Sequence, residues 1–154
     1  LDMKGLVESS INQGVMRAGD NFFVLVGEIR YSHISSRNFI IEKIMALSEL
    51  LEAKVELFAP YPAWKYRRRS DLRQLAVRTY RELFHEKLKP VAVHAGIECG
   101  CLLEKLPHLD AISIGANCWY FHSVNECVSV SSVNKVWIFL KQILENLDRE
   151  FEEE

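Results

Sequence analysis

Two stretches of the sequence combine imidazole, carboxylate and glycine residues in ways that could serve ligand binding or catalysis. The first is His94-Ala95-Gly96-Ile97-Glu98-Cys99-Gly100. We predict that a short buried strand ends at His94 and that a helix begins after it, and α/β proteins place ligand sites at such strand ends. His94 and Glu98 are therefore candidate pocket residues. The alternative is a tight glycine turn in which Glu98 merely favours a helix N-terminus.

The second stretch, residues 115–126, is an irregular run of aromatic and polar residues that contains a single histidine, His122. An imidazole nitrogen is a common zinc ligand, and loops hold ligands well. Most single histidines are ordinary surface or core residues, so composition leaves both roles open. The segment His108-Leu109-Asp110 has the His-x-Asp form of some metal sites. Because it follows Pro107, we interpret it as a turn and the start of a strand.

The four cysteines are too few and too clustered for the disulfide framework of a secreted protein of this length. They are Cys99, Cys101, Cys118 and Cys127. We interpret them as reduced thiols. A structural zinc site is the alternative, although the Cys-x-Cys spacing is not the usual Cys-x2-Cys.

The charge balance argues against partners, such as nucleic acids or anionic membranes, that bind through a strong positive electrostatic potential. The formal net charge is -2 and the isoelectric point is about 6.2, so no global potential would attract nucleic acid or an anionic membrane. No secretory signal and no apolar run long enough to cross a bilayer is evident. We expect a cytoplasmic protein with neither nucleic-acid nor membrane partners.

The elements that must position these residues follow from the apolar pattern and the helix caps. The predicted order is strands at 14–17 and 22–31, a helix capped by Ser35 or Ser36, a strand at 54–58, a helix capped by Ser70, a strand at 90–94, a helix, a strand at 111–115, and a final helix capped by Ser131 or Ser132. In the second strand, Glu28 and Arg30 share one face because side chains alternate. The pattern predicts an α/β protein in two lobes.

The boundary between the two lobes is predicted in residues 59–69, where Pro60 and Pro62 disfavour helix and the composition changes. Three arginines, at 67–69, stand there among aromatic residues, a mixture that single-stranded nucleic acid favours. Because no wider basic stripe accompanies them, we interpret this segment as a solvated junction.

Several of these segments together resemble the aminoacyl-histidine dipeptidases, a family within the superfamily of two-zinc exopeptidases. The resemblance spans nearly the whole chain and is carried, in order, by residues 7–15, Tyr61-Pro62-Ala63-Trp64-Lys65, residues 94–100, Ser113-Ile114-Gly115, and His122-Ser123 with Glu126. It implies that residues 1–64 are the end of an inserted lid domain. Residues 65–154 would be the C-terminal portion of the catalytic domain.

The resemblance also implies roles for individual residues. His122 would bind one of two zinc ions, and Arg30 would hold the carboxylate of an Xaa-His dipeptide substrate. Asn12 would be a neighbouring lid contact, and the backbone amide of Gly115 would approach the substrate. His94 and Glu98 would line the pocket. The partner implied is the N-terminal catalytic portion, and we also expect a homo-oligomer.

The chain departs from the family pattern in ways that limit what it can do alone. Val124 and Asn125 follow Ser123 where the family usually has proline and aspartate. The other metal ligands and the general-base glutamate of the family precede the lid and have no counterpart here, so no catalytic residue is assignable in this chain. The sequence predicts the C-terminal fragment of a zinc dipeptidase, inactive by itself. The alternative is a non-catalytic binding or oligomerisation module with the same fold.

Overall fold

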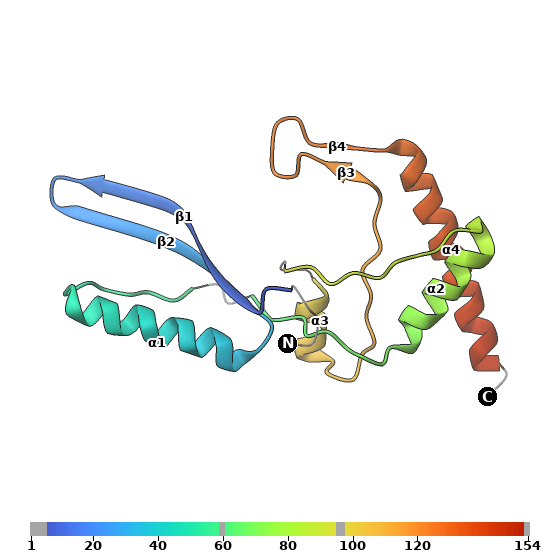
Figure 1. Cartoon of the computed structure of the whole chain (residues 1–154), viewed down its shortest axis with the longest axis horizontal. Helices are drawn as coiled ribbons and strands as arrows, with labels where there is room; N and C mark the ends of the chain where they lie inside the picture. Colours follow the sequence, from blue (N-terminus) through green and yellow to red (C-terminus); the bar gives the residue numbers. More distant parts are fainter. Residues whose placement is uncertain (1–5, 59–60, 95–97, 153–154) are drawn as a thin grey trace. The chain divides into compact units, whose positions relative to one another are not determined.

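The computed structural model describes residues 6–58, 61–94 and 98–152, which form two compact units (Figure 1). One unit contains residues 1–67 and 92–109, and the other contains residues 68–91 and 110–154. The mixture of helices and strands confirms the predicted α/β class. Within the described ranges, no helix is both long enough and apolar enough to cross a membrane.

The first unit is built around an antiparallel hairpin of β1 (Ser9–Gly19) and β2 (Phe22–Tyr31). The predicted hairpin is confirmed, and its first strand begins earlier than expected, at Ser9. Gln13 lies opposite Gly27 and Val15 lies opposite Val26, so Gly14 is an extra residue that forms a β-bulge. Helix α1 (Ile34–Leu50) runs beside the hairpin, and the short helix α3 (Cys99–Lys105) completes the unit (Figure 1).

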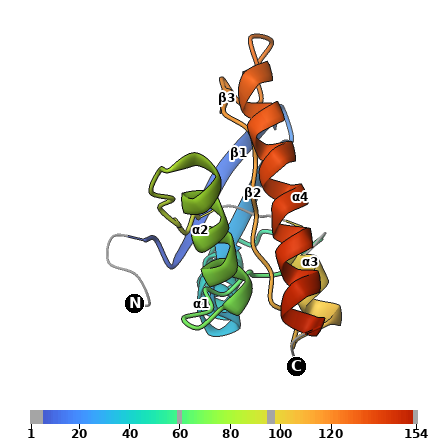
Figure 2. The same cartoon turned by 90° about the vertical axis from the view of Figure 1, so that its right-hand side faces the viewer.

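The second unit has its core between α2 (Asp71–Phe84) and α4 (Val130–Glu152), which lie side by side in both views (Figure 2). Four residues form the buried cluster: Leu75, Ala76, Phe139 and Ile143. The fully buried hydroxyl of Thr79 accepts a hydrogen bond of 2.9 Å from the Asn146 amide, which satisfies a polar group between the two helices. Ile112 and Ile114 pack against this core, so the chain is anchored just before Gly115.

Three predicted strands, 54–58, 90–94 and 111–115, are not strands in the structure. An apolar run becomes a strand only when a neighbouring strand supplies ladder hydrogen bonds. Within the described residues, the ladders join β1 to β2, and β3 (Cys118–Trp119) to β4 (Cys127–Val128). The three segments are apolar, as the prediction required, but within the described residues no neighbouring strand pairs with them, so they do not form strands.

The helix starts were predicted to within a few residues. Ser70 caps α2 as expected, because its side chain accepts a hydrogen bond of 3.0 Å from the Arg73 amide. Helix α1 begins at Ile34 with His33 as its N-cap, so the caps predicted at Ser35 or Ser36 are wrong. Helix α4 begins at Val130. Its first turn is closed by Ser129, whose hydroxyl accepts from the Ser132 amide at 3.3 Å, and this places the cap before the predicted serines.

Candidate functional site

Four polar side chains project from one face of the β1–β2 hairpin, near the end that contains Ser9 and Tyr31. Ser10 lies opposite Arg30 and Asn12 lies opposite Glu28, and residues paired across an antiparallel ladder project from the same face. A salt bridge of 3.0 Å joins Arg30 Nη2 to Glu28 Oε2. The predicted common face of Glu28 and Arg30 is thus confirmed, and the longer β1 adds Ser10 and Asn12 to it.

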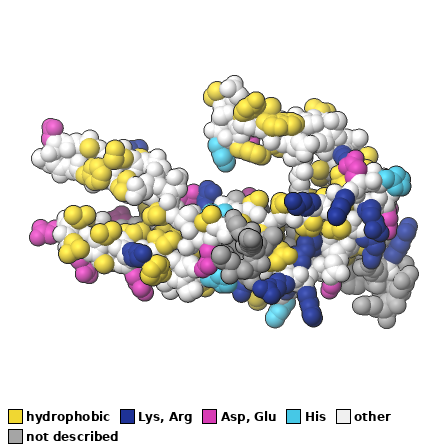
Figure 3. Space-filling view, viewed as in Figure 1, with side chains coloured by type: hydrophobic (Ala, Val, Ile, Leu, Met, Phe, Trp, Pro, Cys, Tyr) yellow, Lys and Arg dark blue, Asp and Glu magenta, His cyan; other side chains and the backbone are white. Residues whose placement is uncertain are grey.

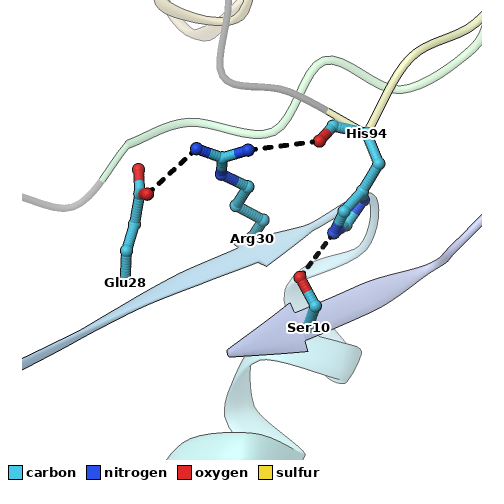
Figure 4. A network of polar contacts seen from close by, with 4 residues as sticks. All are labelled: Ser10, Glu28, Arg30 and His94. Atoms are coloured by element: carbon cyan, nitrogen blue, oxygen red, sulfur yellow. Dashed lines mark hydrogen bonds and ion pairs between the residues drawn. The ribbon is translucent and has the colours of Figure 1, made fainter. Parts of the chain in front are cut away.

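His94, which belongs to a segment far along the chain, contacts Ser10 and Arg30 on this polar face (Figure 4). Ser10 Oγ and His94 Nε2 are 2.7 Å apart, and Arg30 Nη1 donates to the His94 carbonyl oxygen at 3.5 Å. The guanidinium is therefore held between the Glu28 carboxylate and a backbone carbonyl. Its side chain is still 44% exposed, and contacts within the described residues engage two of the five N–H donors of a guanidinium. The remaining donors of Arg30 can bind an external anion while the contacts with Glu28 and His94 are kept.

The helix that follows the His94 segment is packed closely onto the Tyr61 region of the same unit. A Cβ atom added at the buried Gly100 would lie 2.5 Å from the Pro62 carbonyl oxygen, so this glycine permits the close approach. Glu98, at the N-cap of α3, is exposed and forms no side-chain cap hydrogen bond. Its carboxylate is open to solvent. Gly96, the other glycine of the motif, lies outside the described residues.

The cysteines are free thiols. Burial raises the pKa of the Cys99 thiol, a backbone hydrogen bond opposes this shift, and the nearby Glu98 carboxylate adds to it. Desolvation, followed by Cys101 and Glu98, likewise raises the pKa of Tyr61. Among the described residues, no group of three or more His, Cys, Asp or Glu side chains is placed to hold a metal ion.

His122 lies in the loop between β3 and β4 of the second unit. Its imidazole is exposed and forms no side-chain hydrogen bond with the described residues, and its backbone N–H donates to Glu126 Oε2 at 3.1 Å. A lone exposed imidazole fits one position of a metal site, but it cannot make a site without further ligands. Gly115 precedes this loop. A Cβ built at Gly115 would meet no atom within 4 Å, so its backbone is open to close approach.

The structure therefore brings Arg30 and His94 together in the first unit, with Asn12 on the same face and Glu98 at the start of α3. Gly115 and His122 belong to the second unit. Asp110 of the His-x-Asp segment has a structural task, since its Oδ2 accepts from the Leu72 amide at 3.1 Å and caps α2. The predicted turn before it is confirmed by the hydrogen bond from the Leu109 amide to the Leu106 carbonyl, 3.0 Å.

Ser10 and Glu126 were not predicted as site residues, although both lie in segments that carry the family resemblance. Ser10 contacts a histidine 84 positions away, and no local pattern reports such a contact. The bond from His122 to Glu126 spans four positions in a loop. An acidic residue shortly after a candidate ligand was the available signal for it.

Comparison with known proteins shows that the chain is similar to part of two dipeptidases. No family model matches. The chain is 33% identical over 144 residues to the cytosol non-specific dipeptidase of Escherichia coli strain K12, a match that covers 94% of this chain and 30% of that protein. It superposes on the crystal structure of the aminoacylhistidine dipeptidase from Vibrio alginolyticus with a TM-score of 0.75 and 29% identity. That match covers 94% of this chain and 30% of the Vibrio chain, so this sequence spans less than a third of either relative.

Proposed function

Because this chain is homologous to the C-terminal part of the aminoacyl-histidine dipeptidases, we propose that it forms part of a metal-dependent dipeptidase acting in the cytoplasm. The observation that carries the proposal is that one homology covers 94% of the chain, a length that spans the segments of both Arg30 and His122. In this proposal, residues 1–64 are the end of the lid domain and residues 65–154 the end of the catalytic domain. The substrates are Xaa-His dipeptides.

The first unit would bind the substrate. Arg30 would hold the C-terminal carboxylate, because a guanidinium can donate two parallel charge-assisted hydrogen bonds to a carboxylate. Asn12 projects from the same face and would donate a further hydrogen bond. The contact between Ser10 and His94 fixes the segment whose carbonyl holds the guanidinium. The pocket would be completed by the exposed Glu98.

The second unit would supply one metal ligand and one backbone contact. His122 would bind one of two zinc ions through an imidazole nitrogen, and Gly115 would offer its backbone N–H to the substrate. Zinc, when bound, activates a water molecule for attack on the peptide carbonyl. The remaining ligands and the general base would come from the N-terminal catalytic portion of the complete enzyme.

Arg30→Ala in the complete enzyme tests the proposed substrate orientation. We expect KM for an Xaa-His dipeptide to rise about 100-fold, equivalent to about 3 kcal/mol of binding free energy, since the carboxylate loses its charge-assisted partner. An analogue with an amidated C-terminus should be affected much less. Steady-state kinetics on both substrates measures the difference. Arg17→Ala, on the outer part of the same hairpin, is the matched control. An equal rise in KM for both substrates would show that Arg30 is structural.

A second function is favoured by the exposed apolar surface of the first unit. Figure 3 shows apolar side chains over the hairpin and α1, and Met16, Phe22 and Phe23 are 69%, 58% and 65% exposed. Surfaces of this kind mark interfaces. A non-catalytic binding or oligomerisation module would use the surface in this way. An upstream segment with His-x-Asp and further carboxylates in the same reading frame would decide for the dipeptidase.

Both functions predict that the isolated chain associates with itself, because the two strands of the hairpin leave their outer edges unpaired within the described sheet. Dimers are the simplest outcome. Light scattering over a range of protein concentrations should show the mass rising from monomer towards dimer. A folded monomer that persists at high concentration would contradict the prediction.

A further inference from the structure

We infer that Glu126 is a positioning residue for His122, because its carboxylate holds the loop backbone in the conformation from which the imidazole is presented to a metal. The inference rests on the proposed function for the metal itself. The loop contacts that carry it lie within residues 118–128.

The backbone of this loop adopts a conformation that L-amino acids rarely use. Tyr120 has φ of 57° and His122 has φ of 61°, both in the left-handed region where Cβ crowds the backbone. Glycine would relieve this strain at either position. In this conformation the imidazole of His122 is exposed, so the position of the ring depends on what holds the loop backbone.

Hydrogen bonds within the loop hold this conformation. The His122 amide donates to Glu126 Oε2 at 3.1 Å, and the Glu126 amide donates to the Ser123 carbonyl at 3.1 Å. Ser123 Oγ donates to the Tyr120 carbonyl at 2.7 Å and accepts from the Asn125 amide at 3.2 Å. Glu126 is thereby bonded to the loop by its own backbone and by its carboxylate. Among the described residues, the Glu126 carboxylate is the side-chain group that forms a hydrogen bond with the main chain of His122.

The chemistry of this contact suits a positioning role. A side-chain oxygen that accepts the backbone N–H fixes the position of that amide, whether the oxygen belongs to a carboxylate or to a side-chain amide. The bond engages the amide of His122 and leaves both ring nitrogens available. Groups that orient a metal ligand affect metal affinity without touching the metal, typically by about 10- to 100-fold when they are removed.

Zinc binding by the complete enzyme tests the inference, measured by competition with a chromophoric chelator. Glu126→Ala should weaken zinc binding by about 10- to 100-fold. Glu126→Gln, which keeps a carbonyl oxygen at the same reach, should restore most of the affinity. Val124→Ala is the matched control, since the Val124 side chain is fully exposed in the same loop, and it should bind zinc normally. Melting temperatures of the metal-free proteins should be equal.

The outcomes separate the inference from the function on which it rests. Normal zinc affinity in Glu126→Ala would overturn the positioning role, and so would equal losses in Glu126→Ala and Glu126→Gln. Normal affinity in His122→Ala would instead overturn the proposed metal ligand. Should Glu126→Ala fail to melt cooperatively, Glu126→Asp decides, because its shorter carboxylate keeps the charge but loses the reach. Weakened zinc binding in Glu126→Asp supports the inference, and unchanged binding overturns it.

Discussion

The isolated 154-residue chain is expected to release no histidine from an Xaa-His dipeptide, with or without added zinc. A two-zinc site takes several histidine and carboxylate ligands, and the described residues contain no group of three such side chains close enough to share an ion. Even an adventitious ion on His122 would lack an aligned general base, and proton transfer alone contributes about 10²- to 10⁴-fold to rate. Histidine release followed by chromatography over several hours is the measurement.

The complete enzyme is the positive control for this experiment, under the same zinc concentration and substrate. Turnover by the isolated chain that a chelator removes, and that His122→Ala abolishes, would show that this chain holds its own metal site. The ligands would then have to be sought among His94, Glu98, His108 and Asp110.

His122→Ala in the complete enzyme is expected to reduce dipeptide turnover by about 10³-fold, which corresponds to about 4 kcal/mol of transition-state stabilisation. The reason is that the imidazole closes the ligand set of a zinc ion that activates the attacking water, and an incomplete set binds the ion weakly. Elemental analysis should show a lower zinc content per enzyme molecule, and kcat should fall with it.

His108→Ala provides the matched control, because it removes another exposed histidine from the same chain. It should leave zinc content and kcat unchanged. If His122→Ala enzyme keeps its full zinc content and normal turnover, His122 is not a ligand and the proposed metal chemistry of this loop is wrong.

The sequence predicted the local features of the fold that depend on nearby residues. The Ser70 cap, the hairpin turn and the turn before Asp110 arise within a few positions, and each was found where it was expected. The strands predicted at 54–58, 90–94 and 111–115 failed for the opposite reason. Whether an apolar run pairs depends on a partner strand that can stand anywhere in the chain, and local composition contains no information about it.

In the candidate site too, the features that depend on nearby residues were predicted and the contacts between distant segments were not. Arg30 and Glu28 were placed on one face by alternation, because a two-residue period is a local property. The contact of Ser10 with His94 was not predictable, since it depends on how the segment at residues 92–94 returns to β1. The β-bulge was also missed. It breaks the alternation on β1 without an obvious sequence signal other than a glycine.

The bulge at Gly14 determines where this hairpin can change in length. Gly14 faces no residue across the ladder, so its deletion would leave Ser10 opposite Arg30 and Val15 opposite Val26. Strand β2 has no such spare residue. A deletion there between Val26 and Arg30 would move one of these two pairs out of register. Insertions and deletions among related sequences should therefore fall on β1 near residue 14, while the number of residues between Val26 and Arg30 stays fixed.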